Sequence, residues 1–293
     1  MKTEMTAEEY RVKIDAALAE YFKLPDTLPQ SGLAKSMRYS LLAGGKRIRP
    51  MLVLEFCRIA GGDPEKAMPI ACAVEMLHTY SLIHDDLPCM DNDELRRGKP
   101  TNHVVFGECT ATLAGDTLQA EAFGTILRSE LSAERRAACA EILAGAVGLD
   151  GMCGGQYLDT IWEGRDLTEK ELTEINSRKT GALLVAACQM GVAAAGGTEK
   201  MLDCAGHFGA AVGMAFQIRD DMLDEMSTVE MLGKPIGSDR QQDKHTYMLL
   251  MGRDGCEKTV HELTEFAKKI LCEAFEDTAF LCKLADALSV REK

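Results

Sequence analysis

The chain has 293 residues and a mass of 32.0 kDa, enough for one large domain or two ordinary ones. Hydrophobic residues make up 46% and charged residues 27%, which excludes a disordered chain, a collagen-like repeat and a disulfide-stapled mini-protein. The 33 Lys and Arg against 46 Asp and Glu give a formal net charge of -13, which argues against a general nucleic-acid surface, because such a surface needs a basic face.

The cysteines and the first residues bear on the cellular compartment. The 11 cysteines form no Cys-x-x-Cys pair, and residues 1–10 contain no apolar run of the kind found in secretion signals. So many thiols would mispair under oxidising conditions, so we expect reduced thiols and a cytoplasmic protein. No uninterrupted apolar run approaches the ~18 residues needed to span a bilayer.

Helix-forming residues dominate, and runs of alternating β-branched residues are scarce, so we predict an all-α fold. The breaks between helices carry Gly and Pro, and none is long or of low complexity, which predicts a single domain over residues 1–293. The predicted helices are 7–22, 50–60, 67–84, 110–130, 133–147, 169–195, 199–224, 247–251, 255–276 and 278–289.

The first charged motif is Gly-Gly-Lys-Arg-Ile-Arg-Pro at residues 44–50. Lys46, Arg47 and Arg49 come just before a helix that we predict to begin at Pro50, a favourable residue for a helix start. Cations beside a helix N-terminus make an anion site, although each of them alone could be a solvated charge.

The next motif, at residues 81–91, contains Asp85, Asp86 and Asp91. Pro88 should end the preceding helix near Leu87, which leaves the first two aspartates at the negative end of the helix dipole. Such a cluster is costly unless cations neutralise it, although a surface acidic patch is the simpler alternative. His78 lies two turns before Asp85, where it has either a polar role in a cavity or that of a satisfied core histidine.

A second acidic cluster lies at residues 216–224, where Gln217, Asp220 and Asp224 share one face of a predicted helix. Like charges at this spacing destabilise a helix by roughly 0.2–0.5 kcal/mol per pair. Two such clusters inside apolar helices make a chance acidic patch improbable. Oxygen-only sites suit Mg²⁺ or Mn²⁺ that share their shell with water and phosphates. An EF-hand is a poor fit because Arg96 stands where its loop needs Gly.

Basic residues alternate with these clusters along the chain: Arg96, Arg97, Lys99, Lys179, Lys234 and Lys244. Each alone could be a solvated charge. Together with the carboxylates they indicate a polyphosphate substrate, held through metal ions and direct cationic contacts. The sequence has no Gly-x-x-x-x-Gly-Lys-Ser/Thr motif, which disfavours a P-loop NTPase.

From about Leu41 to Leu250 the chain resembles the trans-prenyl diphosphate synthases, most closely the bacterial farnesyl diphosphate synthases. The motifs that carry the resemblance are Gly-Gly-Lys-Arg-x-Arg-Pro (44–50), Asp-Asp-x-x-x-x-Asp (85–91), Arg-Arg-Gly-Lys-Pro (96–100), Gly-Gly-Gln (154–156), Lys-Thr-Gly (179–181), Phe-Gln-x-x-Asp-Asp-x-x-Asp (216–224), Gly-Lys (233–234) and Lys-x-Thr-Tyr (244–247). The resemblance implies an isoprenoid-synthase-type helical bundle around a central product cavity, a homodimer and three Mg²⁺.

The resemblance also assigns roles to residues. The implied metal ligands are Asp85, Asp86 and Asp91 for two ions and Asp220, supported by Asp221 and Asp224, for the third. The implied groups for the diphosphate of isopentenyl diphosphate are Lys46, Arg49, His78 and Arg97. The implied groups for the allylic diphosphate are Arg96, Lys179, Lys234 and Lys244. Thr180 and Gln217 would steady the developing cation by their oxygen dipoles. Two departures are Ser238, where many relatives carry Lys, and Arg219 before the second aspartate pair.

Product length is expected to depend on residues deeper along the helix that ends at Asp85. Tyr80 lies ~7.5 Å before Asp85 along the helix axis, and Ser81 one turn before it. Tyr80 could floor the cavity or simply pack in the core. An aromatic residue at this position resembles C15-making enzymes, so we expect farnesyl diphosphate. The stretches at residues 89–93 and 99–103 also resemble C20-making relatives, so geranylgeranyl diphosphate is the alternative.

Two other classes of protein share some of these features. A terpene cyclase usually carries an Asn/Asp-x-x-Ser/Thr-x-x-x-Glu second site and many cavity aromatics, whereas this chain has a second aspartate motif and few aromatic residues. A non-catalytic subunit of a heteromeric synthase tends to lose aspartates, whereas both clusters are intact here.

Overall fold

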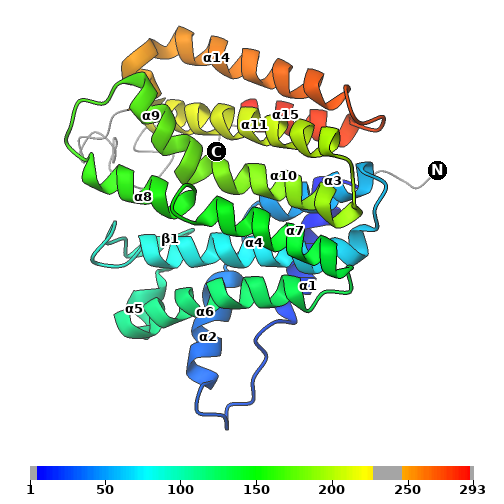
Figure 1. Cartoon of the computed structure of the whole chain (residues 1–293). Helices are drawn as coiled ribbons and strands as arrows, with labels where there is room; N and C mark the ends of the chain where they lie inside the picture. Colours follow the sequence, from blue (N-terminus) through cyan, green and yellow to red (C-terminus); the bar gives the residue numbers. More distant parts are fainter. Residues whose placement is uncertain (1–4, 227–245, 291–293) are drawn as a thin grey trace. The chain divides into compact units, whose positions relative to one another are not determined.

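The computed structural model describes residues 5–226 and 246–290 (Figure 1). Within these ranges the regular secondary structure is helical apart from one short antiparallel hairpin, so the predicted all-α fold is confirmed. The α-helices are α1 (Ala7–Ala19), α2 (Ser31–Leu41), α3 (Ile48–Ile59), α4 (Pro64–Asp85), α5 (Asn102–Phe106), α6 (Glu108–Leu127), α7 (Ala133–Val147), α8 (Met152–Ile161), α9 (Glu169–Asn176), α10 (Ala182–Ala195), α11 (Glu199–Met226), α14 (Tyr247–Leu271) and α15 (Ala279–Ser289). A π-helical turn, η1 (Ser177–Gly181), joins α9 to α10, and the hairpin pairs β1 (Leu95–Arg96) with β2 (Lys99–Pro100).

The chain divides into two compact units. The N-terminal unit comprises residues 1–140 and 193–196, and the C-terminal unit comprises residues 141–192 and 197–293.

Helix α4 organises the N-terminal unit and packs against α3 and α6 (Figure 1). It begins at Pro64, where the side chain of Asp63 accepts a hydrogen bond from the Glu65 N–H at 3.0 Å, three residues before the predicted start. Its sides are apolar nearly all round, which is typical of a helix buried in a core. It ends at Asp85, close to the expected end, so the first acidic motif follows directly from a rigid element.

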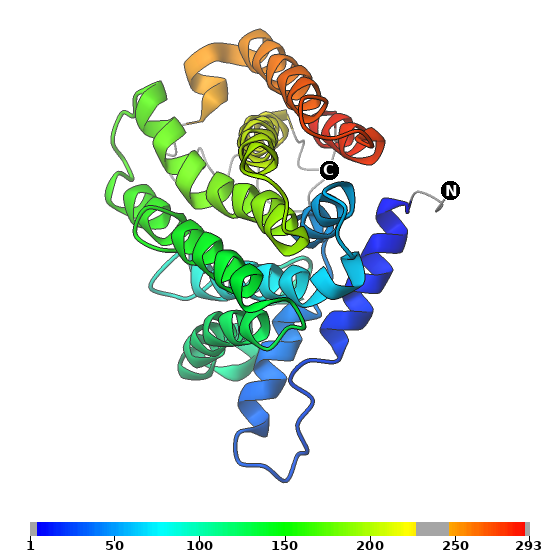
Figure 2. The same ribbon diagram turned by 45° about the vertical axis from the view of Figure 1, so that its right-hand side comes forward.

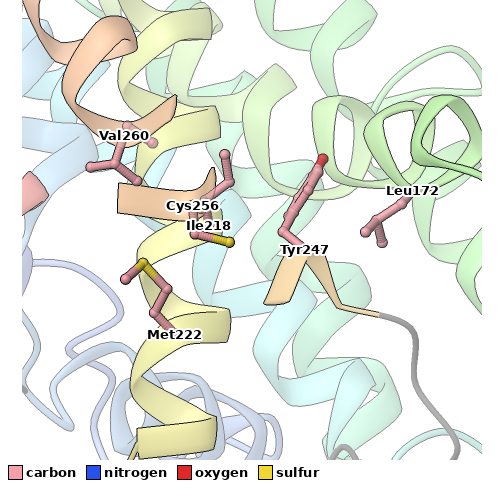
Figure 3. Packing of buried hydrophobic residues seen from close by; sticks show 7 residues of the cluster. Leu172, Ile218, Met222, Tyr247, Cys256 and Val260 are labelled. Carbon is pink, nitrogen blue, oxygen red and sulfur yellow. The ribbon is translucent and has the colours of Figure 1, made fainter. Parts of the chain in front are cut away.

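Helices α11 and α14 (yellow and orange) lie side by side in the C-terminal unit in both views (Figures 1 and 2). Between them a buried cluster includes Ile218, Met222, Tyr247 and Cys256 (Figure 3). Tyr247 is the first residue of α14 and is only 2% exposed. The start of α14 is therefore fixed against the helix that carries the second acidic motif.

Several elements differ from the sequence-based expectation. Helices α2, α5 and α8 and the hairpin were not predicted, and η1 interrupts the long helix expected over 169–195. The two helices expected over 247–276 form one element with a kink at Gly252, whose φ is 67°. The apolar segment 133–161 is long enough by composition to cross a membrane, but it consists of α7 and α8 with a turn between them.

Candidate active site

The loop before α3 carries Lys46 and Arg47, and Arg47 is held by carboxylates of the protein itself. Arg47 has a left-handed conformation, with φ of 51°, and caps α3, so the helix begins at Ile48 and not at Pro50 as predicted. Its guanidinium is buried and donates to Glu75 Oε1 at 2.6 Å and to Asp15 Oδ1 at 2.9 Å. Because carboxylates of the protein itself neutralise its charge, Arg47 holds the loop before α3 in place.

Arg49, His78 and Arg97 form a cationic cluster within the N-terminal unit. The Nε of Arg49 is buried and has no hydrogen-bond partner among the described residues. Burial lowers the pKa of Arg49, and the neighbouring Arg97 lowers it further, while Glu75 opposes the shift. Burial and the nearby arginines, Arg49 foremost, hold the pKa of His78 well below its usual range. The positive charges of Arg49 and Arg97, close together in a partly buried region, favour the binding of an anionic ligand.

The hairpin after α4 presents Arg96 and Arg97 at its turn. Arg97 has a φ of 53°, and its guanidinium donates to the carbonyl of Gly44 in the loop before α3. Gly45 has a φ of 136°, a left-handed conformation that favours glycine, and a Cβ there would lie 2.7 Å from Arg97 Nη1. The Tyr39 hydroxyl donates to the carbonyl of Pro100 at 2.7 Å and holds the hairpin against α2.

The acidic turn after α4 brings Asp85 and Asp91 together. The N–H of Asp91 donates to the carbonyl of Asp85 at 2.9 Å, so the chain folds back on the helix end. Asp86 is only 3% exposed, and its Oδ1 accepts a hydrogen bond from Arg96 Nε at 2.7 Å. Burial raises the pKa of Asp86, and the ion pair with Arg96 opposes this shift. A pocket opens beside this ion pair, and Thr79 lines it as well.

The π-helical turn η1 carries Lys179 and Thr180 in the C-terminal unit. Such turns often occur at functional sites because they redirect side chains. Helix α8 packs closely on it, since a Cβ on Gly155 would lie 2.3 Å from the backbone nitrogen of Lys179. The close packing of α8 on η1 thus explains the glycine at residue 155 of the Gly-Gly-Gln motif. Lys179 Nζ also pairs with Asp159 Oδ2 of α8 at 2.6 Å.

A chain of hydrogen bonds links η1, α11 and α14. The Thr180 hydroxyl donates to Gln217 Oε1 at 3.4 Å, and Gln217 Nε2 donates to Asp221 Oδ1 at 3.1 Å. The other oxygen of Asp221 accepts from the Tyr247 N–H at 2.8 Å. Asp221 is 7% exposed, whereas Asp220 is half-buried. Gln217 therefore has a defined amide orientation, with its oxygen toward Thr180.

The predicted site residues are thus gathered in two groups. The N-terminal unit places Arg49, His78 and Arg97 together, and Asp85, Asp86, Asp91 and Arg96 around one turn. The C-terminal unit places Lys179, Thr180, Gln217, Asp220 and Asp221 on η1 and α11. Lys46 is exposed beside the anchored loop. The side chain of Asp224, and the whole of Lys234, Ser238 and Lys244, lie outside the described residues.

The acidic turn fits a metal ion that keeps part of its shell for other ligands. The described residues contain no group of three or more His, Cys, Asp or Glu arranged as a metal cage. Mg²⁺ is usually held by one or two carboxylates together with water and substrate phosphates. Asp85 and Asp91, tied together by a backbone hydrogen bond, supply donors of that kind.

Sequence reasoning missed Glu75 and Asp159, which hold Arg47 and Lys179. Glu75 is a carboxylate in the middle of an apolar helix, and this was a usable signal, because a buried carboxylate needs a cation. Asp159 follows Gly-Gly-Gln by three residues, and its local sequence gives no sign of its partner in η1.

The family model described as polyprenyl synthetase matches residues 30–282, and the chain belongs to this family. The chain is 43% identical to farnesyl diphosphate synthase of Geobacillus stearothermophilus, over 100% of this chain and 99% of that relative. It is 45% identical to the chloroplastic geranylgeranyl pyrophosphate synthase of Capsicum annuum, over 88% of this chain and 71% of that relative. Among solved structures it is similar to an apo FPP/GFPP synthase from Zymomonas mobilis, with a TM-score of 0.87, 33% identity and 97% of each chain covered.

Proposed function

We propose that this protein is a trans-prenyltransferase that condenses isopentenyl diphosphate with dimethylallyl or geranyl diphosphate to give farnesyl diphosphate. The observation that carries the proposal is that α4 bears a histidine of the cationic cluster, His78, and two turns later the acidic turn that begins at Asp85. One helix thus carries residues proposed for a direct anion site and residues proposed for a metal-assisted anion site, which supports the proposal. The full-length similarity to a farnesyl diphosphate synthase supports the same reaction.

Lys46, Arg49, His78 and Arg97 would bind the diphosphate of isopentenyl diphosphate. The buried Nε of Arg49, which has no described partner, would gain an oxygen acceptor on binding. Neutral His78 can donate from one ring nitrogen to a phosphate oxygen without adding a further charge to the cluster.

Asp85, Asp86 and Asp91 would hold two Mg²⁺, and Asp220, with Asp221 and Asp224, a third; Mn²⁺ would fit the same oxygen donors. When bound, these ions would neutralise the allylic diphosphate and make it a better leaving group. Asp86 and Asp221 accept hydrogen bonds from protein donors, which hold these two carboxylates in place within their motifs.

Arg96, Lys179, Lys234 and Lys244 would hold the allylic diphosphate. Arg96 is oriented by Asp86, and Lys179 by Asp159, so both cations are positioned before substrate arrives. The allylic C–O bond breaks and its electron pair leaves with the diphosphate. The oxygen dipoles of Thr180 and Gln217 would steady the resulting cation, and the double bond of isopentenyl diphosphate attacks it. Loss of a proton to the departed diphosphate then forms the new double bond.

Tyr80, with Ser81 beside it, would floor the product cavity at the length of a C15 chain. Both side chains are half-buried on α4. The similarity to a geranylgeranyl pyrophosphate synthase keeps a C20 product as the second candidate.

The protein would act as a cytoplasmic homodimer with one catalytic domain per chain. Exposed apolar side chains on α5 and α6, among them Val104, Leu113 and Leu127, support association with a second copy.

The test is to incubate the purified chain with Mg²⁺, isopentenyl diphosphate and each allylic starter, and to measure the length of the products. We expect farnesyl diphosphate, and no turnover after chelation of the metal. Absence of any prenyl transfer would overturn the proposal, and a terpene hydrocarbon from the allylic substrate alone would indicate a cyclase.

A further inference from the structure

We infer that His84 is a positioning residue that fixes the ring of Tyr80, and that helix α6 therefore helps to set product length. The inference rests on the proposed function, in which Tyr80 floors the cavity. Tyr80 and His84 are four residues apart on α4 and share one face. Their ring centroids are 4.9 Å apart with an interplanar angle of 77°, an edge-to-face contact that favours one orientation of the rings.

Helix α6 holds the imidazole of His84 from the other side. His84 Nε2 lies 3.0 Å from the backbone carbonyl oxygen of Thr112. A carbonyl oxygen can only accept, so Nε2 carries the proton and donates it. The side chain of His84 is 25% exposed, so this hydrogen bond is partly shielded from water. The ring is thereby tied to the backbone of a rigid helix.

Gly115 of α6 provides the space in which this imidazole lies. A Cβ at this position would be 2.2 Å from His84 Nε2 and 2.4 Å from Cδ2. Carbon atoms normally approach to ~3.5–4.0 Å, so the imidazole could not remain beside an alanine. A glycine inside a helix is unfavourable, and its presence in the buried part of α6 is explained by the need to admit His84.

The contacts thus run from α6 through His84 to Tyr80. Loss of the imidazole removes one of the contacts that hold the Tyr80 ring, so the ring can turn and the floor of the cavity becomes deeper. Longer products are the expected consequence.

The experiment compares His84→Ala, Gly115→Ala and Tyr80→Ala with wild type. Each is given Mg²⁺, isopentenyl diphosphate and geranyl diphosphate, and the C20:C15 product ratio is measured by chromatography. We expect the ratio to rise in all three, by roughly threefold to tenfold for His84→Ala and Gly115→Ala. Gly124→Ala is the matched control on α6, because its Cβ would meet only the guanidinium end of Arg128, and it should give the wild-type ratio.

A wild-type ratio in His84→Ala and Gly115→Ala, beside a raised ratio in Tyr80→Ala, would overturn the inference and leave the proposed function standing. An equal rise in Gly124→Ala would overturn it too, because the effect would then come from α6 in general. If Gly115→Ala does not fold, as judged by its thermal melt, His84→Ala decides the question. If the wild-type chain transfers no prenyl group, the proposed function fails and the inference with it.

Discussion

The two Asp-Asp pairs are alike in burial, but the partners described for the buried carboxylate differ between them. In each pair the first residue, Asp85 or Asp220, is half-buried, and the second, Asp86 or Asp221, is buried. Asp86 is paired with the full charge of Arg96. The donors described for Asp221 are dipoles, namely the amide of Gln217 and the Tyr247 N–H.

Because of this difference, we expect the two buried aspartates to affect the reaction in different ways. Asp86 holds a cation proposed to touch substrate, so its effect should reach catalysis through Arg96. Asp221 joins α11 to the start of α14, so its effect should reach catalysis through the fold of the C-terminal unit. The two Asp-Asp pairs therefore need not have the same function, although their sequences are alike.

The largest expected effect concerns the half-buried aspartates. Asp85→Ala and Asp220→Ala should each lower kcat by roughly 10²–10³-fold or more, because each removes a group that stabilises charge in the transition state. Steady-state kinetics at saturating Mg²⁺ measures this. Glu94→Ala, which removes an exposed carboxylate from the same loop, should stay within a few-fold of wild type. Near-normal turnover of Asp85→Ala would remove Asp85 from the site.

A second prediction extends the comparison to Glu75, a third buried carboxylate. Glu75→Ala should destabilise the protein by about 3–5 kcal/mol, because it leaves Arg47 as a buried and poorly paired charge. Glu65→Ala breaks the exposed pair with Lys13, which has a similar distance of 2.8 Å, and should cost at most about 1 kcal/mol. Urea unfolding of both variants tests the contrast, and equal losses would contradict it.

A third prediction compares the two buried aspartates directly. Asp221→Asn should destabilise the protein by about 1–3 kcal/mol, because an asparagine has one acceptor oxygen for two described donors. Asp86→Asn should destabilise it less, because it removes a buried charge while Arg96 keeps access to water through a side chain that is 32% exposed. Its larger effect should be a raised KM for the allylic diphosphate. The opposite order in urea unfolding would argue against the distinction.

The smallest expected effect is a pH dependence from His78. Its pKa is lowered in the folded protein, so the unfolded chain takes up a proton first as the pH falls. The folded state of the ligand-free protein should lose stability below pH ~6.5, by at most ~1.4 kcal/mol per pH unit. The free energy of unfolding, measured at pH 7.5 and at pH 5.5, should therefore change less between the two pH values in His78→Gln than in wild type. An equal change in wild type and variant would show that His78 does not contribute.

The sequence by itself determined most of the helices and the positions of the charged motifs. Residues 133–147 form the predicted helix, and α4 ends beside Pro88 as expected. These features are local, because helical periodicity, capping residues and proline act over a few positions. Helix α2 was not predicted, and its first residue has no side-chain cap to mark it.

Only the tertiary structure decided which partners the charged residues have. The local sequence shows Lys46, Arg47 and Arg49 only as three cations before one helix, whereas in the fold Arg47 pairs with Glu75, 28 residues away. The resemblance gives Asp221 a role in support of Asp220, but it does not reveal that Asp221 is bound to the start of α14, 26 residues away. The physical reason is that a side chain's burial and partners depend on elements that are distant along the chain and meet only when the fold closes.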